Sequence, residues 1–220
     1  NYRICHIHGG EETKGAIDNA FRHSITMMAN YHFASTEEYK QRIIQMRNSS
    51  ENVYNVGALS IDNLTHLKLL TKKELSITYN IDFHKPYILV TFHPETVNYE
   101  NNINHTTELL NALNELTEYN IVITMPNADT SGNYIRNKLI IFSRQHKNVY
   151  LFENMGTINY LSCMKYCEFM LGNTSSGFIE ASYFPKKVIN IGKRQTGRII
   201  TPNIINCDIK KEAILGSIKL

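Results

Sequence analysis

The sequence predicts an α/β protein in which parallel sheets are covered on both faces by helices. Short β-branched or apolar runs alternate along the chain with longer segments of helical period. Such alternation is typical of parallel strands joined by crossover helices. The 220 residues are 42% hydrophobic and 20% charged, an ordinary balance for a globular chain with one large domain or two small ones.

Eight strands are predicted in chain order, each a short run rich in β-branched, aliphatic or aromatic residues. They span residues 3–7, 31–34, 53–56, 87–92, 121–124, 149–152, 169–171 and 188–191. Helices are predicted between them, at residues 36–46, 65–80, 108–119, 134–146 and 158–166. In the third of these, Leu109, Leu113 and Leu116 are spaced three or four apart, as a helix that covers a sheet requires.

A domain boundary is predicted near residues 65–86, where a polar helix and a short connection precede a new strand. Residues 1–66 hold three strands, which are too few for a sheet covered on both faces. Residues 67–85 are predicted to be a linker, and residues 86–220, with five strands, a nearly complete second domain. Ligands of such sheets bind beyond the carboxyl ends of the strands, so each strand end is a candidate site.

Composition excludes several classes of partner. The net charge of +3 is small and the basic residues are scattered, so no nucleic acid partner is predicted. No run approaches the roughly 18 apolar residues of a membrane span, and no apolar signal peptide follows Arg3; a cytoplasmic protein without membrane contact is expected. Cys163 and Cys167 read as buried thiols. No cluster with metal-ligand spacing is present, so catalysis without metal or cofactor is predicted.

The first candidate motif follows strand 3–7 and runs from His6 to Asp18. A glycine pair permits close backbone approach, while His8, Glu11 and Asp18 bring groups that can transfer protons to the strand end. An alternative for Asp18 is a purely structural helix cap. His6 is expected to point into the sheet, because it alternates with its neighbours along the strand.

The second motif, Phe92-His93-Pro94-Glu95-Thr96, ends strand 87–92. Pro94 favours an extended conformation for His93 and projects it from the strand end. With a pKa near its ordinary value, that imidazole is expected to act as acid or base at neutral pH. The alternative is a histidine that caps the following turn.

Two further motifs follow neighbouring strands. Small polar residues after strand 169–171 enter a helix, where hydroxyls and free amides favour an anion, and Glu180 lies about one turn further on. The alternative is an ordinary Ser/Thr cap. After strand 188–191, Arg194 is expected to lie beside this serine loop and to reach a diphosphate, although a solvated basic turn would look similar. The two motifs are Gly172-Asn173-Thr174-Ser175-Ser176-Gly177 and Gly192-Lys193-Arg194-Gln195-Thr196-Gly197-Arg198.

Taken together, these motifs resemble the hydrolysing UDP-N-acetylglucosamine 2-epimerases, especially the bacterial sialic-acid type and the epimerase half of the animal bifunctional enzyme. They occur in the family order over nearly the whole chain, and as an ordered set they are highly specific. The matching pieces are His6-Ile7-His8-Gly9-Gly10, Gly15-Ala16-Ile17-Asp18 with Arg22-His23, Phe92-His93-Pro94, Gly172 to Gly177, and Gly192 with Arg194-Gln195 and Gly197-Arg198.

The resemblance implies a glycosyltransferase-B-like fold of two facing Rossmann-like domains, with a UDP-sugar in the cleft and a homodimer as the assembly. It implies that Thr174, Ser175 and Ser176 hold phosphate, within a loop completed by Asn173 and Gly177. Glu180 would hold the ribose, and Arg194 with Gln195 part of the nucleotide. Backbone near Met155 and Gly156 would meet uracil. His93 and Asp18 match positions implicated in proton transfer and sugar contacts.

The implied reaction makes N-acetylmannosamine and UDP from UDP-N-acetylglucosamine through a glycal, for sialic acid synthesis. Alternatives are the same reaction on UDP-N,N′-diacetylbacillosamine, for legionaminic acid, and an inactive nucleotide-sugar-binding fragment. A glycosyltransferase of this fold fits the ordered motifs less well. The His8-Gly9-Gly10 form favours the sialic branch.

The sequence departs from the family at three points. Many relatives have glutamate where this chain has His8, so Glu11, Glu12 or neither takes the family carboxylate role. The resemblance also implies that the first domain lacks its amino-terminal strands, with a basic nucleotide loop and another catalytic acid. It further implies that the closing carboxyl-terminal helix is cut short at Leu220.

Overall fold

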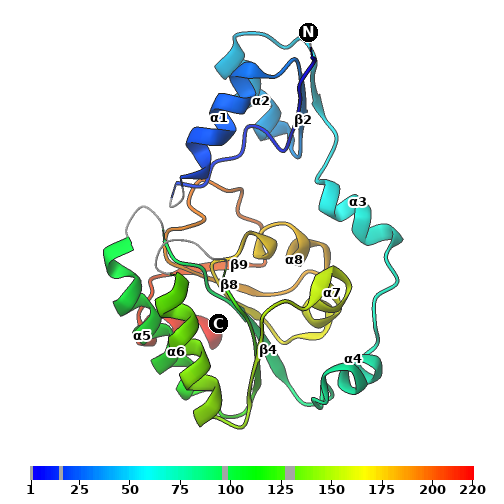
Figure 1. The fold of residues 1–220 in the computed structure, drawn as a ribbon. Coiled ribbons are helices and arrows are strands. Elements are labelled where there is room, and N and C mark those ends of the chain that lie inside the picture. Colours follow the sequence, from blue (N-terminus) through cyan, green and yellow to red (C-terminus); the bar gives the residue numbers. More distant parts are fainter. Residues whose placement is uncertain (1, 15–16, 96–98, 127–131) are drawn as a thin grey trace.

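The computed structural model describes residues 2–14, 17–95, 99–126 and 132–220, which form two parallel sheets (Figure 1). The smaller sheet has the order β1 (Cys5–Ile7), β2 (Tyr31–Ala34) and β3 (Val53–Asn55). With α1 (Asp18–Met28) and α2 (Glu37–Arg47), it makes up what we call the small lobe. All three strands lie where the sequence predicts them, and His6 is buried as expected.

The larger sheet has six parallel strands and, with its helices, makes up the large lobe. The strands run in the order β6 (Val149–Phe152), β5 (Asn120–Thr124), β4 (Tyr87–Thr91), β7 (Met170–Gly172), β8 (Val188–Ile191) and β9 (Ile204–Cys207). This is the Rossmann order, and it reverses direction between β4 and β7, where ligands of such sheets bind. The prediction of five strands was wrong: β9 is the sixth. Its only strongly apolar pair, Ile204 and Ile205, gives too short a signal.

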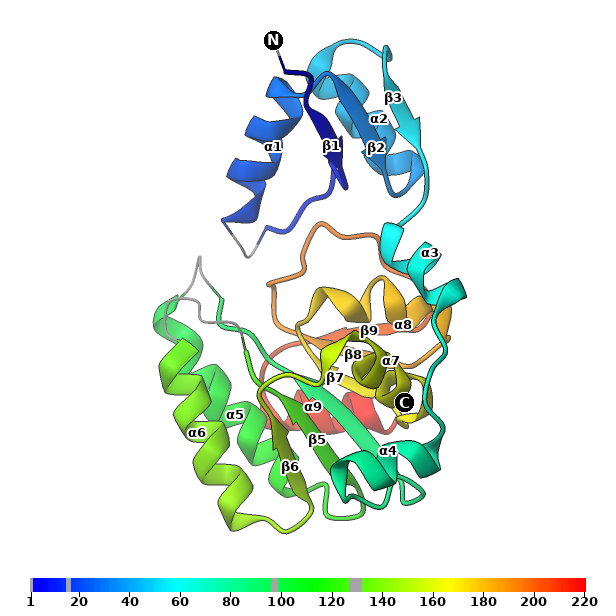
Figure 2. The same cartoon turned by 45° about the vertical axis from the view of Figure 1, so that its right-hand side comes forward.

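Helices cover both faces of the large sheet, which confirms the predicted class (Figures 1 and 2). On one face α5 (Asn102–Asn114), which follows the 3-10 turn η1 (Tyr99–Asn101), packs with α6 (Gly132–Gln145) and α9 (Lys211–Ile218) against Ile88 and Val90. On the other, α4 (Lys72–Tyr79), α7 (Gly156–Tyr166) and α8 (Glu180–Tyr183) pack against Tyr87 and Leu89. Consecutive residues of β4 alternate between the two cores, as the period of a strand requires.

Helix boundaries were predicted less well than strands. Helix α5 begins at Asn102 and ends at Asn114. The predicted start at residue 108 was too late, because the first turns of the helix are polar and carry no apolar stripe. The single helix predicted over residues 65–80 is wrong. The structure has α3 (Leu59–His66) and then α4, which a capping box between Thr71 and Glu74 begins. Such a box satisfies two free amides at once and starts a new helix.

Helix α3 and the segment that follows it connect the two lobes (Figure 2). The backbone amide of Leu70 donates to Oγ of Ser162 on α7 at 2.9 Å, which fixes this segment against the large lobe. Leu64 of α3 is buried in the same core as α7. The boundary that the sequence predicts at residue 66 falls at the last residue of α3, and it stays a prediction. In the described parts of the chain, no helix has the length and apolar character needed to cross a membrane.

Gly172 allows β7 to approach β4 at the point where the strand order reverses. Its φ is +144°, and a Cβ built there would collide with the carbonyl of Thr91. We expect Gly172→Ala to lower the free energy of unfolding by about 3 kcal/mol, because the change adds backbone strain to a steric collision. Urea denaturation followed by circular dichroism measures this.

Gly216 in α9 is the matched control, since a Cβ there meets nothing within 4 Å. Gly216→Ala should stabilise the protein by about 1 kcal/mol or less, the helix preference of alanine over glycine. Equal effects of the two substitutions would contradict the steric explanation.

Candidate functional site

Paired hydrogen bonds join the ends of β4 and β7. The amide of His93 donates to Oδ1 of Asn173 at 2.7 Å, and Nδ2 of Asn173 donates to the carbonyl of His93 at 2.8 Å. The amide of Asn173 also donates to the carbonyl of Thr91 at 3.1 Å. Asn173 is fully buried. Its side chain is therefore used to hold the two strand ends together.

The loop after β8 joins the same cluster. Nε2 of Gln195 donates to the carbonyl of Asn173 at 2.7 Å, and Nη1 of Arg194 approaches the same oxygen at 3.4 Å. The amide of Lys193 donates to Oε1 of the buried Glu95 at 3.0 Å. Arg194 thus lies beside the serine loop, where the sequence places it. Three motifs that are distant in the chain converge at the switch point of the sheet.

A cavity of about 340 Å³ opens beside these strand ends. Five of the predicted residues line it: His93, Met155, Gly156, Thr174 and Ser176. The structure places Gly177 elsewhere, packed so that a Cβ there would lie 2.9 Å from Cγ1 of Val188. Ser175 begins the short 3-10 turn η2 (Ser175–Gly177).

Tyr160 also lines this cavity, and sequence reasoning missed it. Its hydroxyl lies 2.7 Å from Oγ of Ser176. The capping interpretation of Thr174 is correct as well, because its Oγ1 accepts from the amide of Ser176 at 3.4 Å. Capping and lining the cavity are compatible roles for one hydroxyl. Tyr160 lies inside α7, where an aromatic residue looks like any core residue in sequence.

The electrostatic state of His93 differs from the prediction of an ordinary pKa. His93 is only 9% exposed. This burial is the main cause that lowers the pKa of His93 to about 4, and the positive charge of Arg194 is the second. Both effects disfavour the imidazolium. His93 is therefore neutral at pH 7 in this structure.

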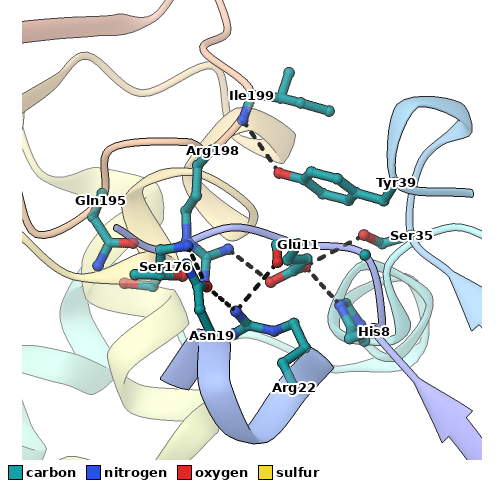
Figure 3. A network of polar contacts seen from close by, with 12 residues as sticks. His8, Glu11, Asn19, Arg22, Ser35, Tyr39, Ser176, Gln195, Arg198 and Ile199 are labelled. Carbon is teal, nitrogen blue, oxygen red and sulfur yellow. Dashed lines mark hydrogen bonds and ion pairs between the residues drawn. The ribbon is translucent and has the colours of Figure 1, made fainter. Parts of the chain in front are cut away.

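A second polar cluster is centred on Glu11, at the end of β1 (Figure 3). Its Oε1 lies 3.1 Å from Nδ1 of His8 and accepts from Oγ of Ser35 at 3.4 Å. Its Oε2 lies 3.1 Å from Nη1 of Arg198, which comes from the loop after β8. Arg22 of α1 donates to the carbonyl of Glu11 at 3.4 Å. Glu11 as a whole is 4% exposed, so nearly all contacts of its side chain are with protein.

The neighbours of Glu11 decide its charge. Burial alone would raise the pKa of this carboxyl, but the hydrogen bond from His8 and the positive charge of Arg198 outweigh it, and the net pKa is lowered. Glu11 is therefore ionised at neutral pH. Because it is ionised, this buried carboxylate can accept a proton or act as an electrostatic partner.

The other candidates of the first motif lie differently. Nε2 of His8 accepts from the amide of Leu59 at the start of α3, at 3.4 Å, so His8 bridges Glu11 and the connection between lobes. Glu12 is partly exposed and faces Lys14 at 3.9 Å. Asp18 is exposed at the start of α1.

The capping alternative for Asp18 is wrong, because the cap position is Ile17 and carries no side-chain cap bond. Instead, Oδ1 of Asn19 accepts from the amide of Thr13 at 2.8 Å. Residues 15 and 16 of the first motif and residue 96 of the second lie outside the described residues.

Arg198 belongs to the fourth motif, but the sequence assigned it no role. Its loop joins the lobes. The carbonyl of Thr196 accepts from the amide of Lys14 at 2.8 Å, and the amide of Ile199 donates to the Tyr39 hydroxyl at 3.2 Å. Figure 2 shows this segment rising from the large sheet to the small lobe. Arg198 lies four residues after Arg194, but that spacing does not reveal which carboxylate it meets.

Glu180 lines a neighbouring cavity of about 230 Å³ with Ser60, Tyr160 and Ser176. Burial raises the pKa of Glu180, and the charge of Arg198 is among the effects that oppose this rise. Arg198, which pairs with Glu11, therefore also acts on the charge of Glu180. Ser60, on the connecting helix α3, is a second residue without a sequence signal.

The family model and the curated relatives that match this chain point to one family. The model of the family described as UDP-N-acetylglucosamine 2-epimerase matches residues 1–220. A GDP/UDP-N,N′-diacetylbacillosamine 2-epimerase (hydrolyzing) of Campylobacter jejuni is 38% identical over 94% of this chain and 54% of the relative. The polysialic acid biosynthesis protein P7 of Escherichia coli is 37% identical over 100% of this chain and 56% of the relative. The chain thus spans a little over half the length of these curated relatives.

The fold matches solved structures of the same kind. The UDP-GlcNAc 2-epimerase of Neisseria meningitidis, solved with UDP-GlcNAc bound, superposes with a TM-score of 0.81 at 19% identity. The superposition covers 99% of this chain and 61% of that one. The two parallel sheets, the Rossmann order of the larger one and this match establish the predicted α/β fold.

Proposed function

Since the chain belongs to the UDP-N-acetylglucosamine 2-epimerase family, we propose that it forms the nucleotide-sugar site of a hydrolysing 2-epimerase that acts on a UDP-linked 2-acetamido sugar. The observation that carries this proposal is the cavity at the switch point, with His93, Thr174 and Ser176 in its wall and Arg194 beside it. Hydroxyls and a guanidinium at one strand end suit a diphosphate.

The binding roles follow from the walls of the two cavities. Thr174 and Ser176, from the wall of the first cavity, and Ser175 between them would donate to phosphate oxygens, and Arg194 would neutralise the charge of the phosphate. Glu180 borders the second cavity, where its carboxylate would accept hydrogen bonds from ribose hydroxyls. The backbone at Met155 and Gly156 would meet uracil. Asn173 and Gln195 would support this arrangement from behind, through the bonds that hold the loops together.

The chemistry needs a proton acceptor near C2 of the sugar and stabilisation of the departing UDP. We assign the acceptor role to Glu11, which is ionised and buried. It would take the C2 proton while the C1–oxygen bond breaks and its electron pair leaves with UDP, giving a glycal. Water would then add oxygen at C1 and a proton at C2 on the opposite face. The product would be the free sugar with inverted C2.

His93 would serve the leaving group. A bound diphosphate carries negative charge, which raises the pKa of a neighbouring imidazole. His93 would then take up a proton and donate it to the departing phosphate oxygen. His8 would hold Glu11 through Nδ1. Asp18 would take part only if the lobes or the residues near it move, since it is exposed here.

Two substrates remain as candidates. UDP-N-acetylglucosamine, giving N-acetylmannosamine for sialic acid synthesis, is supported by the E. coli relative named for polysialic acid biosynthesis. UDP-N,N′-diacetylbacillosamine is supported at least as well by the Campylobacter relative. The second substrate carries an acetamido group at C4 where the first has a hydroxyl, so one site rarely serves both equally.

The decisive experiment incubates the full-length protein with each UDP-sugar and follows UDP and free sugar by NMR. We expect UDP release with C2 inversion for one substrate and a much lower kcat/KM for the other. UDP binding without turnover of either sugar would support a binding module instead. In this proposal residues 1–66 belong to one Rossmann-like domain, 67–85 are the linker, 86–220 are the second domain, and the protein is a homodimer.

Arg194 gives a test of the nucleotide site. We expect Arg194→Ala to weaken UDP binding by roughly 1.5–3 kcal/mol, the usual contribution of a hydrogen bond to a charged group. Calorimetry on the folded protein measures this. Arg144, an exposed residue near the end of α6, provides the control: Arg144→Ala removes the same charge and should leave the affinity unchanged. An unchanged affinity in Arg194→Ala would remove Arg194 from the site.

A further inference from the structure

The loop between β8 and β9 contributes residues to both polar clusters. Arg194 and Gln195 contact the carbonyl of Asn173 at the nucleotide cavity. Four residues after Arg194, the guanidinium of Arg198 reaches Oε2 of Glu11 at 3.1 Å. A single short segment therefore connects the proposed diphosphate site with the proposed proton acceptor.

This loop is packed closely enough to transmit a change in position. Backbone bonds tie Thr196 to Lys14 and Ile199 to Tyr39. At Gly197, where φ is +99°, a Cβ would lie 2.8 Å from Cβ of Glu12. The side chain of Arg198 is 9% exposed and that of Glu11 5%. A packed loop with buried charges cannot shift without moving its partner.

We propose that Arg198 is a positioning residue that couples occupancy of the nucleotide site to the placement and charge of Glu11. The coupling rests on the proposed function, because it assigns a diphosphate to Arg194 and proton transfer to Glu11. When Arg194 holds phosphate, the loop is held against the small lobe, and Arg198 keeps the carboxylate ionised and fixed in the cleft. Without nucleotide the loop is held less firmly, and Glu11 loses its partner more often.

The contacts of Glu11 separate this role from general packing. His8 and Ser35 hold Oε1 from the small lobe, whereas Arg198 holds Oε2 from the large lobe. The other charged or titratable groups that act on this carboxyl are Arg22, through its charge, and Tyr39, whose own pKa responds to Glu11. Of these contacts to the carboxylate oxygens, the one from Arg198 crosses between the lobes.

The test compares Arg198→Gln with Arg42→Gln in the full-length protein. Arg42 donates to the carbonyl of Gly10 at 2.6 Å, so it holds the same strand end without touching the Glu11 carboxylate. The readouts are the carbon-13 carboxyl titration of Glu11, assigned by difference with Glu11→Gln, and kcat against UDP affinity.

For Arg198→Gln we expect the pKa of Glu11 to rise by about 1–2 units, because a positive charge at this distance lowers a carboxyl pKa by about 1–3 units. We expect kcat to fall by roughly 10–100-fold, as displaced catalytic groups do, with UDP affinity within about threefold. In the wild type, saturating UDP should shift the Glu11 carboxyl signal, and this shift should be lost in Arg198→Gln. Arg42→Gln should behave as the wild type.

Equal titration curves and equal kcat in Arg198→Gln and the wild type would overturn the inference. If Arg198→Gln does not fold, Arg198→Lys replaces it. It keeps the charge but not the planar fork, so kcat should fall with UDP affinity kept, and an unchanged kcat would overturn the inference. If the wild type turns over neither UDP-sugar, the proposed function fails, and the Glu11 titration with and without UDP still decides the role of Arg198.

Discussion

Replacing His93 by asparagine in the full-length protein should lower turnover by about 10²–10⁴, the usual contribution of a general acid or base. UDP affinity should stay within a few-fold, because the nucleotide is held by Arg194 and the serine loop. The physical reason is that asparagine keeps a polar side chain at the end of β4 but cannot take up and release a proton. Steady-state kinetics and calorimetry on one preparation measure both quantities.

The alternative role for His93 is a structural one, as a cap of the turn that follows. It predicts reduced thermal stability with nearly normal turnover per folded molecule. His105 of α5 is the control, since it lies outside the cavity that His93 lines; His105→Asn should leave turnover unchanged. Near-normal turnover in His93→Asn would reject the catalytic assignment.

Replacing Glu11 by glutamine should have an effect of the same size, about 10²–10⁴ on kcat. The amide fills the same space but cannot accept the C2 proton, and it no longer carries the charge that Arg198 and His8 meet. Breaking a buried ion pair also destabilises a protein, by about 3–5 kcal/mol. Turnover must therefore be expressed per folded molecule, with the folded fraction measured by circular dichroism.

Glu12 provides a matched control, because it is the neighbouring residue and carries the same side chain. It is partly exposed and pairs only at 3.9 Å with the exposed Lys14. Glu12→Gln should keep kcat within about threefold, since exposed pairs contribute little. The reverse result, with Glu12→Gln inactive and Glu11→Gln active, would transfer the carboxylate role to Glu12. The sequence left this choice open, and the burial of Glu11 now favours one answer.

Most elements of the fold could be predicted from the local sequence. The eight predicted strands all exist. In the large sheet, β4, β5, β7 and β8 are compact apolar runs whose residues are nearly all buried, whereas β1 and β3 of the small sheet are mostly exposed. Strand β9 was not predicted, because its two adjacent isoleucines show no period of apolar residues. The prediction of one helix over residues 65–80 was wrong for a different reason. The capping box at Thr71 starts a new helix inside this range, and its hydrogen bonds stabilise that start more than the weak apolar stripe stabilises a continuous helix.

The sequence by itself determined the class of fold, the order of the motifs and the expectation that they meet at strand ends. It could do so because parallel strands place their carboxyl ends at one edge. Only the tertiary structure decided which side chains meet: Asn173 with His93, and Arg198 with Glu11 across the lobes. It also decided their charge. A pKa depends on burial and on neighbours brought from distant parts of the chain, so the neutral His93 and the ionised Glu11 have no local signature.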